Sequence, residues 1–195
     1  MTTASPRRRD RARLPAPERR RQIIDVTTRL IAERGFWGLS MQDVADDCGL
    51  TVPGLLHHVG SKDRLLVAVL EHRDEQDHRS LTEALGRPET EVPLPEICAA
   101  LVERNAAQPE IVRLFAVLEV ESLAPDHPAH EYFRARQENT IRVMTTLART
   151  HGVPEPETLA RQVMALMDGL QIQWLRDPEG LDLITAWNTA AKALF

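Results

Sequence analysis

The chain has 195 residues, of which 43% are hydrophobic and 27% are charged. This composition is typical of a globular protein that is large enough to bury one or two cores. No run of about 18 apolar residues occurs, which argues against a membrane span, and the first residues lack the apolar segment of a signal peptide. Cys48 and Cys98 each stand alone in a helical pattern, so we expect two reduced core thiols in a cytoplasmic protein.

The charge is unevenly distributed along the chain. The formal net charge is −5, yet residues 1–62 carry +4 and residues 63–195 carry −9. A positive N-terminal part suits phosphates, and an acidic remainder disfavours nonspecific adhesion to DNA. Residues 1–17 are rich in Arg, Pro and Ser and are predicted to be a disordered basic arm. Two roles stay open for it: a solvated tail, or contact with phosphates and a minor groove through Arg7, Arg8, Arg9, Arg11 and Arg13.

Residues 18–63 are predicted to form three helices, of which the last two are joined by a tight turn. The first helix spans residues 18–34. Ser40 can cap the second, with Asp43 three residues later as in a capping box. Gly49 stands where a helix end needs a left-handed residue, and Thr51 can cap a third helix that tolerates Pro53 in its first turn. This pattern indicates a helix-turn-helix, whose second helix enters a DNA major groove.

The rest of the chain is predicted to be helical throughout, which gives an all-α fold of about nine helices. A long helix is expected over residues 62–85, capped by Ser61. A polar loop follows over residues 89–95. The Pro and Gly breaks that come after it separate helices near 96–106, 109–122, 128–151, 156–176 and 181–194.

Residues of the predicted helix-turn-helix and its neighbours follow one another in a characteristic order and spacing over about residues 19–70. They are Ala32, Gly35, Phe36, Leu39, Ser40, Met41, Val44, Ala45, Gly49, Leu50, Thr51, Gly54, Leu55, His58, Ser61, Lys62, Asp63, Leu65 and Leu66. In these residues the chain resembles the TetR family of bacterial transcriptional regulators. The resemblance implies a helix-turn-helix DNA-binding domain at 18–63, a helical ligand-binding and dimerisation domain at 64–195, and repression relieved by a small molecule.

The recognition helix departs from the family pattern at one position. The family usually has a Tyr there that contacts a phosphate, whereas this chain has Leu56, which has no donor. His57 is expected to contact DNA from a neighbouring surface, while His58 either does so or packs in a partly buried position. The predicted DNA-binding residues are Ser40, Thr51, Val52, Pro53, Gly54, His57, His58 and Lys62.

Two predictions concern the C-terminal helices. Helices 156–176 and 181–194 are too apolar to face water on every side, and we expect them either to pair with a second copy or to close the core of one chain. The dimerisation candidates are Leu166, Gly169, Leu170, Trp174, Leu183, Trp187 and Leu194. By family analogy, helices 96–176 hold a small-molecule pocket, for which the candidates are Phe115, Leu118, Glu119, Met144, Met164, Met167, Asp168 and Gln171. A buried Glu119 or Asp168 would be suited to a cationic ligand.

Enzymatic function is not expected, because the chain has no Gly-rich phosphate loop, G-x-S-x-G or H-E-x-x-H motif. A metal site could be considered at Asp126, His127 and His130, but a polar helix start explains these residues better. No metal or cofactor is predicted. The expected partners are double-stranded DNA, a second copy of the chain and a small molecule, with no membrane. The alternative is a helical protein-interaction module that has lost sequence-specific DNA reading, which Leu56 and the apolar run Val52-Pro53-Gly54 favour.

Overall fold

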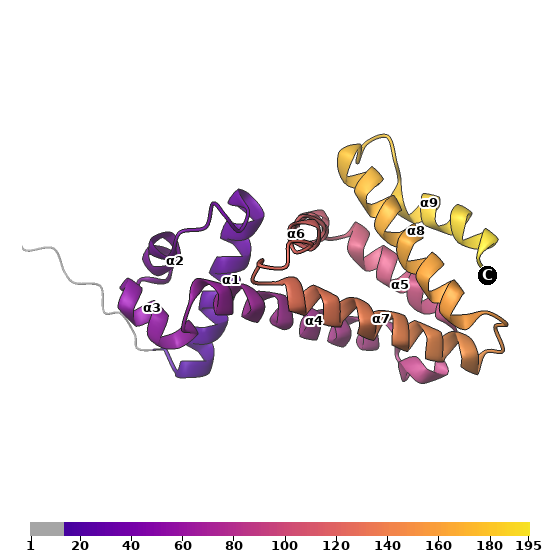
Figure 1. The fold of residues 1–195 in the computed structure, drawn as a ribbon, viewed down its shortest axis with the longest axis horizontal. Coiled ribbons are helices and arrows are strands. Elements are labelled where there is room, and N and C mark those ends of the chain that lie inside the picture. The colour runs from indigo at the N-terminus through magenta and orange to yellow at the C-terminus, as the bar shows by residue number, and fades with distance from the viewer. Residues whose placement is uncertain (1–13) are drawn as a thin grey trace, which may run out of the picture.

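The computed structural model describes residues 14–195. This part of the chain is all-α, with nine α-helices, two short 3-10 helices and no strand, which confirms the predicted fold class. Figure 1 shows α1 to α3 at one end, α5, α8 and α9 at the other, and α4 and α7 running along the molecule. The helices are α1 (Ala16–Arg34), α2 (Met41–Cys48), α3 (Val52–Val59), α4 (Lys62–Leu85), α5 (Leu94–Ala106), α6 (Pro109–Glu121), α7 (His130–Thr150), α8 (Pro156–Arg176) and α9 (Leu183–Ala190).

The helix-turn-helix forms where its local signals predicted it. The Ser40 Oγ accepts hydrogen bonds from the backbone N–H groups of Gln42 and Asp43, and Gly49 ends α2 with φ 65° and ψ 33°. The other half of the predicted capping box is absent, because the Asp43 carboxylate pairs with Arg34 at 2.8 Å instead. A second ion pair, Arg29 to Asp47 at 2.6 Å, also joins α1 to α2.

One apolar core holds the N-terminal helices and continues beyond them. It includes Leu55 of α3 and Leu65 and Leu66 of α4, all with no exposed surface. Leu118 of α6 and Phe133 of α7 belong to the same core. The core of the helix-turn-helix is therefore continuous with that of the helices that follow residue 63, the predicted domain boundary.

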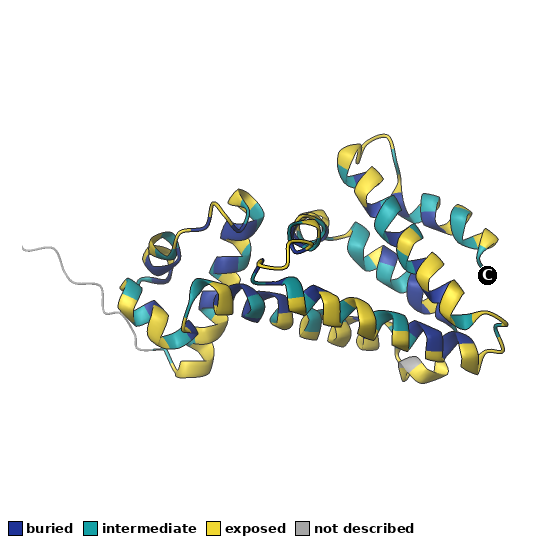
Figure 2. Cartoon of the chain, in the orientation of Figure 1, coloured by how far each residue is buried: buried dark blue, intermediate teal, exposed yellow. Residues whose placement is uncertain are grey.

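A second core lies among α5, α7, α8 and α9, and Figure 2 shows its buried positions on the faces where these helices meet. Cys98 belongs to it and Cys48 to the first core; both thiols are free, as predicted, and burial raises the pKa of Cys98 to about 12. No helix within residues 14–195 is both long and apolar enough to cross a membrane.

A few boundaries differ from the predictions at helix ends. Helix α1 begins at Ala16, because Pro17 is compatible with a first turn. Helix α5 begins at Leu94, inside the expected loop, and residues 89–91 of that loop form a 3-10 helix. The last helix ends at Ala190 and continues as a 3-10 turn over Ala191–Ala193. The five arginines of the predicted arm lie outside the described residues.

Candidate nucleic-acid interface and ligand cavity

The recognition helix α3 exposes one narrow stripe. Pro53, Leu56 and His57 are exposed, at the i, i+3 and i+4 spacing that places them on one helical face. The opposite face buries Leu55 and Val59 against the N-terminal core. This division leaves the outer face of α3 available to a groove.

The two helix N-termini beside this stripe are capped by hydroxyl groups. Thr51 is exposed, and its Oγ1 accepts a hydrogen bond from the Gly54 N–H at 3.2 Å. Ser40 is likewise exposed. Each hydroxyl keeps its own hydrogen to donate, and the N-termini present the positive ends of helix dipoles, so both positions suit phosphate oxygens.

The remaining predicted DNA-binding residues are half-buried. They are Val52, Gly54, His58 and Lys62. The ring of His58 lies edge-on to that of His57, with centroids 5.7 Å apart. The Lys62 ammonium lies 4.6 Å from the centroid of the Phe36 ring, so a cation–π contact holds it at the start of α4.

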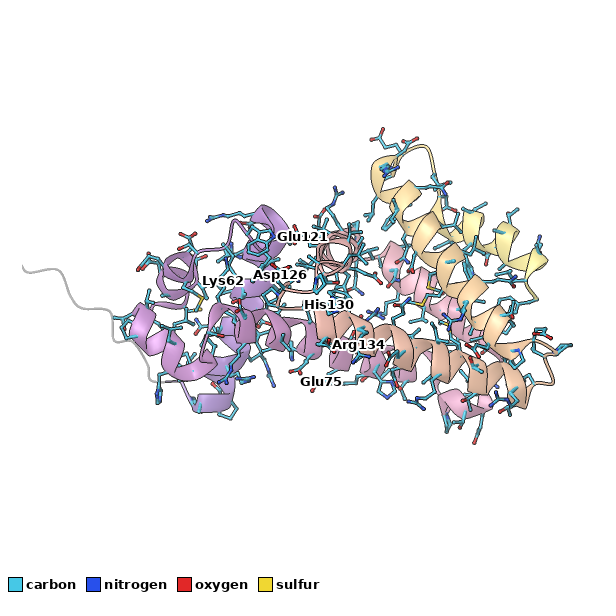
Figure 3. All side chains as sticks on the ribbon, viewed as in Figure 1. Lys62, Glu75, Glu121, Asp126, His130 and Arg134 are labelled. Carbon is cyan, nitrogen blue, oxygen red and sulfur yellow. The ribbon has the colours of Figure 1, made fainter. Side chains whose placement is uncertain are left out.

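An aromatic contact connects the N-terminal helices to the α6–α7 connection. His127 is buried, and its ring centroid lies 5.8 Å from those of both Phe36 and Trp37. Its Nδ1 accepts a hydrogen bond from the Ala129 N–H, and its Nε2 lies 3.9 Å from a Glu121 oxygen. Figure 3 shows Glu121, Asp126 and His130 around this connection, with Lys62 among the N-terminal helices.

The histidines of this connection have structural partners rather than a shared metal geometry. His130 Nδ1 lies 2.8 Å from the Ser122 carbonyl oxygen, whereas His127 faces the two aromatic rings. Within residues 14–195 no group of three His, Cys, Asp or Glu side chains is placed to hold a metal ion. His127 thus packs the connection against the N-terminal helices, and His130 joins the two ends of the connection.

A cavity of about 410 Å³ lies among α4, α5, α6, α7 and α8. Seven predicted ligand residues line it: Phe115, Glu119, Met144, Met164, Met167, Asp168 and Gln171. Leu118 does not, because α6 turns it into the N-terminal core, where it is 1% exposed. Six further titratable residues that were not predicted from the sequence also line the cavity: Arg73, Asp74, Asp77 and His78 of α4, Arg104 of α5 and Arg136 of α7.

Most of these missed charges are paired across helices. Asp77 pairs with Arg73 of its own helix at 2.7 Å and with Arg104 of α5. Asp74 pairs with Arg136 of α7 at 3.2 Å and accepts a hydrogen bond from the Tyr132 hydroxyl. Arg136 also lies over the Phe115 ring, 5.3 Å from its centroid. These contacts fix the polar wall that α4 and α7 contribute to the cavity.

Asp168 and Glu119 face the cavity without such partners. No hydrogen bond or ion pair joins either carboxylate to another described residue. Burial, reinforced by the nearby charge of Glu119, raises the pKa of Asp168 to about 6, although Arg136 opposes the shift. The two carboxylates, from α6 and α8, are therefore close enough to repel each other.

The dimerisation candidates separate into two groups. Trp174, Leu183 and Trp187 are buried in the second core of the same chain, so they close that core rather than offer a surface. Leu166, Gly169, Leu170 and Leu194 are half-buried. A Cβ added at Gly169 would meet nothing within 4 Å, so there is open space beside α8 at this position.

Comparisons with known proteins find similarity to bacterial transcriptional regulators. The family model described as bacterial regulatory proteins of the tetR family matches residues 23–69. The chain is 36% identical over 92 residues to the HTH-type transcriptional regulator BetI of Brucella anthropi. The matched residues make up 47% of this chain and 46% of that protein. It thus spans about half the length of that relative. A BetI of Paraburkholderia xenovorans is 26% identical over 178 residues, 88% of this chain and 89% of that one.

Solved structures share the fold over most of the chain. A regulator from Saccharomonospora viridis in complex with choline has a TM-score of 0.73 at 22% identity, covering 89% of this chain and 93% of that chain. NalD, the secondary repressor of the MexAB-OprM efflux pump of Pseudomonas aeruginosa, has a TM-score of 0.69 at 21% identity, covering 93% and 96%.

Proposed function

Because the chain belongs to the TetR family of bacterial regulatory proteins, we propose that it is a DNA-binding transcriptional regulator and not an enzyme. It binds a palindromic operator as a homodimer, represses transcription, and is released when a small molecule enters the cavity. The observation that carries this proposal is the exposed stripe of α3, flanked by the capped N-termini of α2 and α3. Their placement suits one helix in a major groove with phosphates on both sides.

Few side chains of this interface can read bases by hydrogen bonds. Val52 and Pro53 offer only apolar contacts, which suit thymine methyl groups, and His57 is the exposed polar side chain of the stripe. We therefore expect DNA shape to supply part of the sequence preference. Lys62 and the N-termini at Ser40 and Thr51 supply phosphate contacts that are independent of sequence.

Release by a ligand requires the cavity to be coupled to α3. Helix α4 supplies Arg73, Asp74 and Asp77 to the cavity and begins at Lys62 beside α3, so a tilt of α4 would change the spacing of two recognition helices. The contact of His127 with Phe36 and Trp37 gives a second route through α6. The choline bound to the Saccharomonospora viridis regulator supports a small-molecule ligand for a protein of this fold.

Selection of bound fragments from random DNA tests the proposal. At physiological salt we expect a short palindrome to be enriched, and its affinity should fall steeply as salt rises because phosphate contacts release counterions. An apolar protein partner would be nearly indifferent to salt. Folded protein that enriches no sequence, with or without ligand, would favour the protein-interaction module.

Lys62→Met is the matching variant, since it keeps an unbranched side chain against Phe36 but removes the charge. We expect weaker binding to all DNA sequences alike and a salt slope smaller by roughly 1. Electrophoretic mobility shifts over a salt series would measure both. An unchanged slope would show that Lys62 makes no phosphate contact.

A further inference from the structure

The charges that line the cavity do not cancel locally. At one wall, Asp77 is shared by Arg73 and Arg104, which leaves one surplus positive charge that is partly met by a hydrogen bond from Arg73 to the Gln108 side chain at 2.6 Å. Near Arg136 the balance is reversed. This guanidinium interacts electrostatically with Asp74, Glu119 and Asp168.

Arg136 cannot neutralise all three carboxylates. Its Nε is committed to Asp74 at 3.2 Å, and its guanidinium carbon lies over the Phe115 ring. Glu119 and Asp168 therefore remain as a pair of like charges, brought together from α6 and α8 at a partly buried site. An arrangement of this kind is unfavourable unless a proton or a cation is bound between the two groups.

The wall beside this pair is apolar. Met144 and Met167 are buried, Met164 is half-buried, and all three line the cavity together with Phe115. Thioether side chains adapt to the shape of a bound molecule. A strongly hydrated metal ion would find too few oxygen ligands here, because no group of three candidate ligands exists among the described residues.

We propose that the cavity binds a small monovalent organic cation, with its ammonium group between the Glu119 and Asp168 carboxylates and its alkyl groups against Met144, Met164 and Met167. This proposal rests on the proposed function in one respect only, which is that the bound cation is the class of molecule to which the regulator responds. The bound cation relieves the repulsion between the two carboxylates, while Arg136 stays paired with Asp74.

A pair of isosteric probes separates charge from shape. Choline and 3,3-dimethylbutan-1-ol differ by a quaternary nitrogen in place of a quaternary carbon, so both fill the same volume. Titration calorimetry at pH 7.5 should show choline binding at least about tenfold tighter than the neutral alcohol, since one partly buried charge contact is typically worth a factor of that order. Equal affinities, or no choline binding up to about 10 mM, overturn the proposal.

Glu119→Gln and Asp168→Asn locate the charge. Each variant keeps the side-chain shape and removes one carboxylate, so each should fold and should bind choline about tenfold more weakly while its affinity for the alcohol is unchanged. The control is Glu110→Gln, an exposed residue near the start of the same helix α6, which should bind choline as the parent does. Unchanged choline binding in both cavity variants would place the cation elsewhere and refute the assignment.

DNA binding of the same variants keeps the two proposals apart. Both cavity variants should retain DNA binding, because both residues line the cavity and neither belongs to the apolar core that holds α3. A parent protein that binds choline through Glu119 and Asp168 but enriches no DNA would leave the cation site intact and refute the regulator. A parent that binds DNA but prefers neither probe would leave the regulator intact and refute the cation site.

Discussion

At the scale of single residues, the protonation state of Asp168 in the cavity affects the stability of the folded protein. Its carboxylate is partly buried, and burial together with Glu119 raises its pKa from 3.8 to about 6. The folded protein therefore holds a proton there more tightly than the unfolded chain does. Between pH 3.8 and pH 6 this difference makes folding progressively less favourable as the pH rises. Above about pH 6 the whole cost of an ionised, unpaired Asp168 is present.

This cost predicts that Asp168→Asn stabilises the ligand-free protein. At pH 7.5 the variant should gain on the order of 1–3 kcal/mol in the free energy of unfolding, and the gain should fall by roughly half at pH 5, where the folded parent is already protonated. Thermal unfolding of both proteins at the two pH values measures this. The cavity charges that face Asp168 are common to both proteins: Arg73, Asp74, Asp77, His78, Arg104, Glu119 and Arg136.

A gain that is equal at both pH values would show that the stabilisation comes from something other than the carboxylate charge. The expected pattern is that of a binding site whose empty state lowers the free energy of unfolding. The same substitution that stabilises the free protein is expected to weaken choline binding, so stability and function would move in opposite directions at this residue.

At the scale of one element, α3 shows how a recognition helix can keep its fold and change its contacts. Leu55 and Val59 fix the helix by burial, and Thr51 fixes its start. Leu56 does not belong to that core, and 37% of its surface is exposed. The position where the family usually has a phosphate-binding Tyr is thus free to vary without loss of the fold.

Leu56→Tyr should therefore strengthen DNA binding without much change in stability. A new hydrogen bond from the hydroxyl to a phosphate predicts an affinity roughly two- to tenfold higher on operator DNA. Leu56→Phe is the matched control, which adds the ring but no donor and should leave the affinity near that of the parent. If Phe and Tyr raise the affinity equally, ring packing and not a phosphate contact is responsible.

At the scale of the whole molecule, the C-terminal helices close the core of their own chain and are proposed to contact a second copy through another face. Trp174 and Trp187 close the second core from within. Elsewhere on α8, Ala165 is exposed and Gly169 is half-buried, whereas the neighbouring Ile172, 37% exposed, also lines the cavity. The small residues of this face would let the α8 of a second copy approach closely, as the proposed dimer requires.

Gly169→Arg tests that face with little risk to the single chain. An added Cβ meets nothing within 4 Å in the protomer, and Arg favours a helix over Gly by up to about 1 kcal/mol. We expect a folded monomer by sedimentation equilibrium, where the parent and Gly169→Ala sediment as dimers. A dimeric Gly169→Arg would show that the interface lies on another surface.

The sequence by itself determined the elements of this protein. The caps at Ser40, Thr51 and Ser61 and the turn at Gly49 lie where they were predicted, since each depends on residues within a few positions along the chain. Apolar periodicity likewise placed nine helices, with errors of a few residues at their ends. Seven of eight cavity candidates were found because family analogy named the right helices.

Only the tertiary structure decided what each helical face meets. Periodicity marks Leu118 and Trp187 as apolar, but it cannot tell a cavity, a core and a dimer surface apart, and both residues lie in the core. The polar faces of α4 and α7 are likewise indistinguishable in sequence from solvated surfaces. Asp74 and Arg136, 62 positions apart, form one wall of the cavity. Such a pairing depends on how helices pack, and local signals along the chain contain no information about it.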